Sequence, residues 1–169
     1  MNIDEKVYLS DYNVNWETQF IDEKKLLQTC FHDVPIEHIG STSVKGMTAK
    51  PIIDIMLGTI IYPPPEEMIK NFEELKYLNL GEIDKTNGRF YFVKRSDINY
   101  NVHVVKHLGI LWSSNILFRD YLRTHENKAL EYSKIKQDII NKGVDTLLRY
   151  SDEKREFISN IMKKINARK

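Results

Sequence analysis

Cysteine is almost absent from this 169-residue sequence, which contains only Cys30. A single cysteine excludes an intrachain disulfide and is compatible with a reducing compartment. Cys30 lies near the end of an amphipathic helical pattern, which favours a buried structural thiol over a reactive one. The N-terminal run from Met1 to Glu5 has no apolar signal core, and no apolar run approaches ~18 residues. We therefore expect a cytoplasmic protein without a membrane partner.

An excess of one charge sign is also missing, since the formal net charge is +1. This balance argues against a strongly basic nucleic-acid binder, although it is compatible with a local basic cleft. The hydrophobic fraction of 41% and the charged fraction of 29% are typical of a globular protein. The sequence contains no internal repeat or low-complexity segment. At this length a single domain is expected.

Hydrophobic periodicity predicts an α/β core over residues 1–110 and a helical tail over 111–169. The expected core elements are a helix from Trp16, strands opened by Pro35 and Pro51, a helix from Pro65 whose apolar face reaches Leu78, and strands over 90–93 and 100–105. The stretch 82–89 is polar and contains an Asn87-Gly88 turn signal. In the tail, a capping-type pattern at Ser151 predicts the start of a last helix. This alternation predicts an α/β or α+β domain.

One stretch between the first two predicted strands combines a turn, hydroxyl groups and lysines. Backbone N–H groups in a Gly-Ser turn that follows a strand can bind a phosphate, and nearby lysines offset its charge. The alternative is an ordinary turn whose hydroxyls cap a helix, because the spacing matches neither the dinucleotide fingerprint nor the P-loop. The candidate phosphate- or nucleotide-binding residues are Gly40, Ser41, Thr42, Ser43, Lys45 and Lys50.

Asp54 is a lone acid inside an apolar, β-branched run. Such a carboxylate costs several kcal/mol unless it has a partner or an open cleft, so it is either a Mg²⁺ ligand or an acid paired with Lys50. His103, on a valine-rich strand, is either a hydrogen-bonded core histidine or a metal ligand or general base in the same cleft. Glu37 and His38 alternate across their strand, so at most one of them faces that cleft.

Arg119 and Arg123 lie four residues apart on one predicted helix face. This spacing allows two interpretations. The pair can hold a phosphate, or it can form a solvated face with salt bridges to Asp120 or Glu126. We keep both arginines as further candidates for ligand binding.

Three blocks of the sequence resemble the GrpB family. They are Glu37–Val44 continued by Ala49–Ile55, then Val102–Val105 followed by Phe118–Arg123, and finally the closing run from Tyr150. The resemblance covers nearly the whole chain. It implies a nucleotidyltransferase-like fold, in which a small mixed β-sheet is flanked by helices and followed by a C-terminal helical extension. It also implies that Gly40-Ser41 is the phosphate turn and that Asp54 is the first acid of an acid-x-acid pair.

The sequence departs from the active pattern of that fold at the second acid, where it has Met56. The third acid of that pattern, which is expected on a later strand, is absent too, and His103 stands at roughly its place. Two-metal phosphoryl transfer needs carboxylates that hold ions ~3.5–4 Å apart. We therefore expect at most one divalent ion, Mg²⁺ or Mn²⁺ in preference to Zn²⁺. Its candidate ligands are Asp54, His103, His38 and Glu37, of which Asp54 and His103 are the candidate catalytic residues.

The sequence thus predicts a nucleotidyltransferase-like protein that binds a nucleotide or a phosphorylated small molecule. Two activities remain open at this point. One is metal-assisted nucleotidyl transfer centred on Asp54. The other is a non-catalytic nucleotide-binding or interaction module, an alternative motivated by Met56 in place of the second acid.

Overall fold

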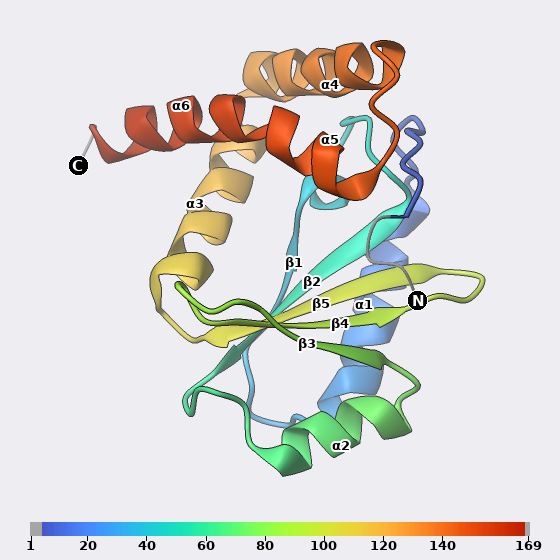
Figure 1. The fold of residues 1–169 in the computed structure, drawn as a ribbon, viewed down its shortest axis with the longest axis vertical. Coiled ribbons are helices and arrows are strands. Elements are labelled where there is room, and N and C mark those ends of the chain that lie inside the picture. The colour runs from blue at the N-terminus through green and yellow to red at the C-terminus, as the bar shows by residue number, and fades with distance from the viewer. Residues whose placement is uncertain (1–4, 168–169) are drawn as a thin grey trace.

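A five-stranded mixed sheet forms the centre of the molecule in the computed structural model, which describes residues 5–167 (Figure 1). Its strand order is β1-β2-β5-β4-β3. β2 and β5 are parallel, whereas the other neighbouring pairs are antiparallel. The strands are β1 (Ile36–Ile39), β2 (Ile52–Thr59), β3 (Leu78–Asp84), β4 (Arg89–Lys94) and β5 (Asn99–Lys106). This small mixed sheet with flanking helices confirms the predicted α+β class.

Within residues 5–167, six α-helices and one 3-10 turn surround the sheet. They are α1 (Asn15–Gln28), η1 (Ser41–Ser43), α2 (Glu66–Glu74), α3 (Ile110–Thr124), α4 (Glu126–Asn141), α5 (Leu147–Glu153) and α6 (Arg155–Asn166). Figure 1 shows α4, α5 and α6 grouped at one end of the molecule, with α2 at the other. None of the helices described between residues 5 and 167 is long and apolar enough to cross a membrane. The sequence also predicted that the N-terminal run lacks an apolar signal core. Residues 1–4 of that run lie outside the described residues.

The two faces of the sheet have different partners because side chains alternate along each strand. On one face, Ile53, Ile55 and Leu57 of β2 join a core with Trp16 of α1 and Phe72 of α2. Burial of each such large side chain contributes about 1.5–3 kcal/mol. Their alternation partners Asp54 and Met56 therefore face the opposite side, where Met56 packs with Trp112 of α3. Alternation thus directs Asp54 toward the helical tail.

Two element boundaries differ from the sequence prediction. The helix expected to reach Leu78 ends at Glu74, since Lys76 adopts φ 65° and the left-handed conformation ends a helix. Leu78 instead begins β3, which turns the polar stretch before Arg89 into one arm of a hairpin. The predicted helix start at Ser151 is also wrong, because Ser151 lies inside α5 and the last helix begins at Arg155.

Candidate functional site

The turn between β1 and η1 is built on Gly40. This residue has φ 70° and ψ −174°, a conformation that is essentially restricted to glycine. A Cβ atom at this position would lie 2.5 Å from Oδ2 of Asp54. Glycine therefore allows the backbone of the turn to lie directly against the carboxylate of β2.

The Asp54 carboxylate is held from the neighbouring strand. Asn101 of β5 lies opposite Asp54 in the parallel register and donates from Nδ2 to Oδ1 at 2.7 Å. Burial raises the pKa of Asp54, but the positive charge of Lys50 and the polar contacts of His103 and Asn101 outweigh it and hold the pKa well below its usual value. Asp54 is therefore ionised at any physiological pH.

His103 lies beside the Asp54 carboxylate. Its Nε2 atom is 3.7 Å from Oδ1 of Asp54, and its ring packs against Tyr91 at a centroid distance of 4.9 Å. Burial lowers the pKa of His103 despite the nearby acid, so the imidazole is mainly neutral at pH 7. His103 thus contacts the predicted acid without lining the cavity described next.

A cavity of about 300 Å³, here called the turn pocket, opens between the Gly40 turn and the helical tail. The start of β2 and helices α3 to α6 complete its wall. Six residues predicted from the sequence line it, namely Gly40, Ser41, Thr42, Lys50, Asp54 and Arg119. Residues that the sequence analysis did not select also line it, among them Asn115, Phe118, Tyr132, Tyr150 and Lys154. The helical tail therefore supplies a large part of the wall.

Several polar groups in the turn pocket have no hydrogen-bond or ion-pair partner in the described part of the chain. Within residues 5–167, neither Lys50 nor Lys154 has an acid within ion-pair distance, and the Ser41 hydroxyl has no hydrogen-bond partner. The Lys154 ammonium lies 4.2 Å from the centroid of the Tyr150 ring. Burial and the charge of Lys50 lower the pKa of Lys154 to about 7. The turn pocket thus holds two lysines without an ion pair, together with the ionised Asp54.

A second cavity of about 810 Å³, here called the α1 groove, lies on the other side of η1. It contains the remaining candidates from the sequence other than His103, which are Glu37, His38, Ser43, Lys45 and Arg123. Thr42 and Arg119 line both cavities. The candidates that follow one another along the chain are therefore divided between two sides of one short turn.

His38 faces α1 and not the Asp54 side of the sheet. Its ring stacks on Phe20 of α1 at 4.7 Å, and its Nε2 atom lies 3.0 Å from the Thr42 hydroxyl. It is opposite Ile55 in the register of β1 and β2, on the apolar face. Burial lowers the pKa of His38 to about 4, so the imidazole is neutral at pH 7.

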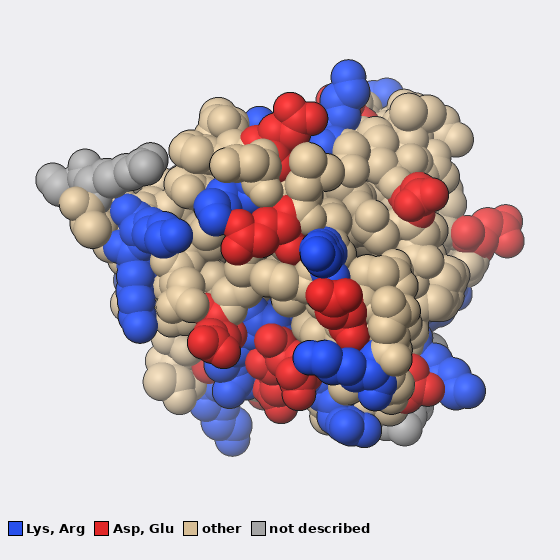
Figure 2. Space-filling model, turned by 90° about the horizontal axis from the view of Figure 1, so that it is seen from above, with Lys and Arg blue, Asp and Glu red and all other residues tan. Residues whose placement is uncertain are grey.

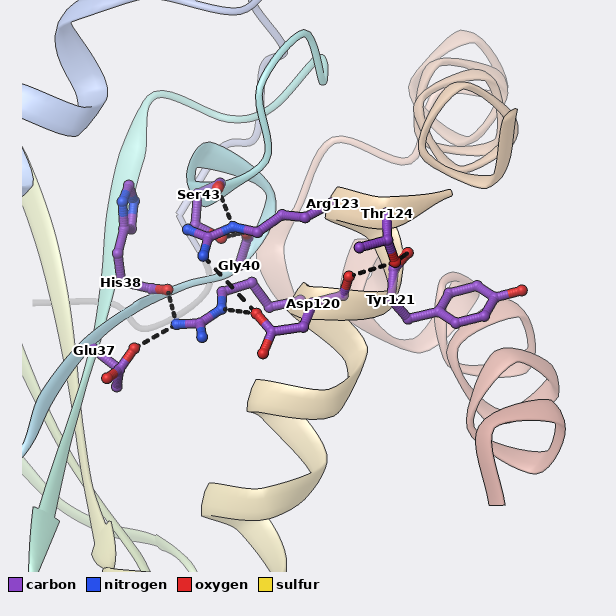
Figure 3. A network of polar contacts seen from close by, with 9 residues as sticks. Glu37, His38, Gly40, Ser43, Asp120, Tyr121, Arg123 and Thr124 are labelled. Carbon is purple, nitrogen blue, oxygen red and sulfur yellow. Dashed lines mark hydrogen bonds and ion pairs between the residues drawn. The ribbon is translucent and has the colours of Figure 1, made fainter. Parts of the chain in front are cut away.

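The arginines of the α1 groove bind protein groups, and Figure 3 shows the contact of Arg123 with Ser43. Arg119 donates from Nη1 to Glu37 at 2.6 Å and to the His38 carbonyl at 3.0 Å, and from Nε to Asp120 at 2.8 Å. Arg123 donates from Nε to the Ser43 carbonyl at 3.0 Å. The salt bridge with Asp120, one of the two predicted arrangements, is thus present. These contacts fasten α3 to β1 and to the η1 turn.

Charge on the outside of the helical end is mixed. Figure 2 shows Lys and Arg side chains interspersed with Asp and Glu side chains on the face seen from above. A nucleic-acid surface usually presents a continuous basic stripe. The unpaired positive charge described above is therefore a local property of the turn pocket and does not extend across this face.

The four predicted metal ligands do not form one group. Among residues 5–167, no three His, Cys, Asp or Glu side chains are placed to share a metal ion. Glu37 binds Arg119, and His38 faces α1. Oδ1 of Asp54 accepts a hydrogen bond, and the fully buried Met56 takes the position of a second acid. The donor set therefore does not fit the two-ion site of the active nucleotidyltransferase pattern.

Sequence comparisons identify relatives over nearly the full chain. A family model described as "GrpB protein" matches residues 6–164. The chain is 33% identical over 167 residues to the "Glutamate-rich protein GrpB" of Alkalihalophilus pseudofirmus, covering 93% of this chain and 94% of that protein. It is also 33% identical over 156 residues to the "UPF0157 protein YqkA" of Bacillus subtilis, covering 90% of this chain and 45% of that protein.

Solved structures agree with the sequence matches. The conserved protein GrpB from Enterococcus faecalis superposes with a TM-score of 0.83 at 28% identity, covering 94% of this chain and 96% of that one. A Cid1 poly(U) polymerase mutant bound to MgATP superposes with a TM-score of 0.52 at 9% identity, covering 75% of this chain and 45% of that one. The second likeness shows the fold alone, and that fold is nucleotidyltransferase-like as predicted.

Proposed function

The chain belongs to the GrpB family, and we propose that it binds a nucleotide or a phosphorylated metabolite in the turn pocket. One observation carries the proposal. Lys50 and the Ser41 hydroxyl, from the connection before β2, and Lys154, from the end of α5, meet in one cavity without a hydrogen-bond or ion-pair partner among the described residues. These three side chains are partly exposed, and convergent polar groups without partners inside a cavity are typical of a binding site.

A phosphoryl group matches these free donors chemically. Within the described chain, the backbone N–H groups of Ser41 and Thr42 have no acceptor, and both belong to the short η1 turn. Successive free N–H groups in such a turn provide an anion site, and lysine ammonium groups add charge-assisted hydrogen bonds. Asp54 lies beneath this turn and attracts Lys50 electrostatically, which keeps the lysine near the phosphate position.

The opposite wall of the turn pocket suits an aromatic or apolar part of the ligand. Phe118 of α3, Tyr132 of α4 and Tyr150 of α5 line it, together with apolar side chains of α6. Aromatic side chains bind planar rings by stacking or edge contacts. The volume of about 300 Å³ is at the lower end of the range for small-molecule sites. A ligand with one phosphorylated end and one apolar end therefore fits this division.

The geometry favours binding without nucleotidyl transfer. A transfer site needs at least two carboxylates to hold its ions, whereas here Met56 is completely buried and Asp54 is hydrogen-bonded to Asn101. The non-catalytic alternative raised by the sequence is therefore the function that we favour. Turnover of any nucleotide by the purified protein would contradict this choice without removing the binding site.

Ligand-induced thermal stabilisation tests the proposal. We expect ATP, CTP, GTP or coenzyme A, each with and without Mg²⁺ or Mn²⁺, to raise the melting temperature. At 100 times the dissociation constant a ligand adds about 2.7 kcal/mol of stability, which corresponds to several degrees. Lys50→Met should reduce the shift, whereas Lys142→Met, at an exposed position outside both cavities, should not. Absence of stabilisation by every member of the panel at millimolar concentration would contradict the proposal.

A further inference from the structure

We infer that Lys50 and Lys154 together take the place of the divalent metal ion, so that the turn pocket binds a phosphoryl group without any metal. This inference rests on the proposed function and names how the same site neutralises its ligand. It assigns a binding role to Lys154, at the junction of α5 and α6. It predicts a phosphate site whose occupancy does not respond to Mg²⁺ or to its removal.

A phosphoryl group brings negative charge that its binding site must offset. Nucleotidyltransferases usually offset that charge with metal ions held by carboxylates. The described part of this chain offers no such cluster, and the single pocket acid already has Asn101 as a hydrogen-bond donor. A different source of positive charge is therefore required if a phosphate binds here.

Two lysines from distant parts of the chain provide positive charge in the turn pocket. Lys50 lies two residues before β2, whereas Lys154 follows α5, more than one hundred residues later in the chain. Both line the same cavity and influence each other electrostatically. Like charges that approach one another in the absence of ligand are destabilising, and an anion between them relieves the repulsion.

The side chain of Lys154 is held in place by an aromatic ring. That side chain is only partly exposed, and its ammonium lies over the face of the Tyr150 ring, which is itself buried. A cation–π contact holds the ammonium in one region without using up its hydrogen-bond donors. In its protonated form, which an anionic ligand favours, Lys154 therefore keeps all three N–H donors for that ligand.

Isothermal titration calorimetry with sodium pyrophosphate and with ATP tests this inference on the full chain. Each probe is titrated once in EDTA and once in excess MgCl₂. We expect measurable binding in EDTA, with an affinity equal to or higher than that in MgCl₂, because Mg²⁺ competes with the lysines for the phosphates. This comparison uses only the unmodified protein, so it does not depend on the folding of any variant.

Three variants then test Lys154 itself. Lys154→Met should weaken pyrophosphate binding in EDTA by about tenfold or more, since a charged hydrogen bond contributes about 1.5–3 kcal/mol and 1.4 kcal/mol is tenfold. Lys154→Arg should retain most of the affinity because it keeps the charge. Lys163→Met is the matched control, as Lys163 is an exposed lysine of α6. Its affinity should equal that of the unmodified protein.

The outcomes separate this inference from the function on which it rests. Binding that requires Mg²⁺ or Mn²⁺ would overturn the inference and leave the proposed function standing. Equal affinity of Lys154→Met and the unmodified protein would overturn the role of Lys154. Absence of binding by either probe in both solutions would overturn the inference, and the nucleotide and coenzyme A panel would then decide the proposed function separately.

Discussion

The turn pocket and the α1 groove lie on opposite sides of the same 3-10 turn, yet the cationic side chains that line them have different partners. In the α1 groove, Arg119 and Arg123 bind carboxylates and backbone carbonyls of the protein itself. In the turn pocket, Lys50 and Lys154 have no such partner among the described residues. Both cavities contain lysines without an ion pair among the described residues, Lys24 and Lys45 in the α1 groove and Lys50 and Lys154 in the turn pocket. The turn pocket brings its two close enough for the charge of Lys50 to lower the pKa of Lys154.

This difference separates structural from functional cations. Arginine suits the first role, because its planar guanidinium satisfies several acceptors at fixed angles. Lysine suits the second, because its ammonium sits on a flexible stem and can follow a ligand. Cavity size would have suggested the opposite choice, since the α1 groove is the larger of the two. The state of the hydrogen-bond donors is therefore the better guide to the binding site here.

Gly40→Ala should have the largest effect on stability, since it changes the turn that separates the two cavities. The new Cβ atom would overlap Oδ2 of Asp54, and the backbone conformation there is unfavourable for alanine. We expect a loss of about 3–4 kcal/mol in the free energy of unfolding, from strain plus the displaced buried charge. Urea denaturation measures this loss.

Gly46→Ala is the control for that substitution. Gly46 also has a positive φ, of 77°, but a Cβ atom there would meet no other atom within 4 Å. Only backbone strain remains, so a loss of about 1 kcal/mol is expected. Equal losses for the two glycine variants would show that the contact with Asp54 is not tight.

Arg119→Met should come next and should act on stability. The substitution leaves the His38 carbonyl and the carboxylates of Glu37 and Asp120 without their donor. Because both carboxylates are partly exposed, we discount the cost of a broken buried ion pair to about 2–3 kcal/mol. Denaturant unfolding measures it. A stability equal to that of the unmodified protein would contradict the structural role given to the α1 groove.

Acid should destabilise the protein through His38. Its pKa is lowered from 6.5 to about 4 by burial, so the unfolded chain binds the extra proton first as the pH falls. Stability from this group is complete above about pH 6.5 and decreases toward pH 4, with a loss of about 2 kcal/mol by pH 4.5. His38→Gln keeps a polar partner for Thr42 but cannot titrate. Its melting temperature should therefore fall less over this range than that of the unmodified protein.

Lys154→Met should have the smallest effect on stability, with a sign opposite to that of Arg119→Met, because the lost contact with the Tyr150 ring offsets much of the charge penalty that the substitution removes. The lowered pKa of Lys154 means that the folded state binds this proton less readily than the unfolded chain does. The resulting penalty is complete below about pH 7 and disappears as the pH rises toward 10.5. The substitution should therefore raise the melting temperature slightly at pH 6 and leave it unchanged near pH 10. Destabilisation at pH 6 would indicate a structural lysine.

Strong local signals explain what the sequence predicted well. The Gly40-Ser41 turn, the strand that carries Asp54, and the alternation of Val102 and Val104 follow from residue type and period alone. The strand before the Asn87-Gly88 turn was missed because β3 is an edge strand with few buried side chains, and its sequence lacks a clear alternating pattern.

Tertiary packing explains why part of the site could not be predicted. Lys154 reaches the pocket only because the chain breaks between α5 and α6, and no glycine or proline marks that break in the sequence. The division of neighbouring candidates, with Ser41 in the turn pocket and Lys45 in the α1 groove, depends on which side of η1 each residue takes. Neither feature has a period or a spacing that a sequence reveals.

Backbone amide chemical shifts measured during a pyrophosphate titration in EDTA test the central claim most directly. The turn pocket account predicts progressive, saturable shifts for Ser41 and Thr42 and for the junction around Lys154. It also predicts small changes at Lys45 and Gly46, which border only the α1 groove. Shifts confined to the α1 groove, or no saturable shift at either place, would contradict the claim that the unpaired lysines mark the binding site.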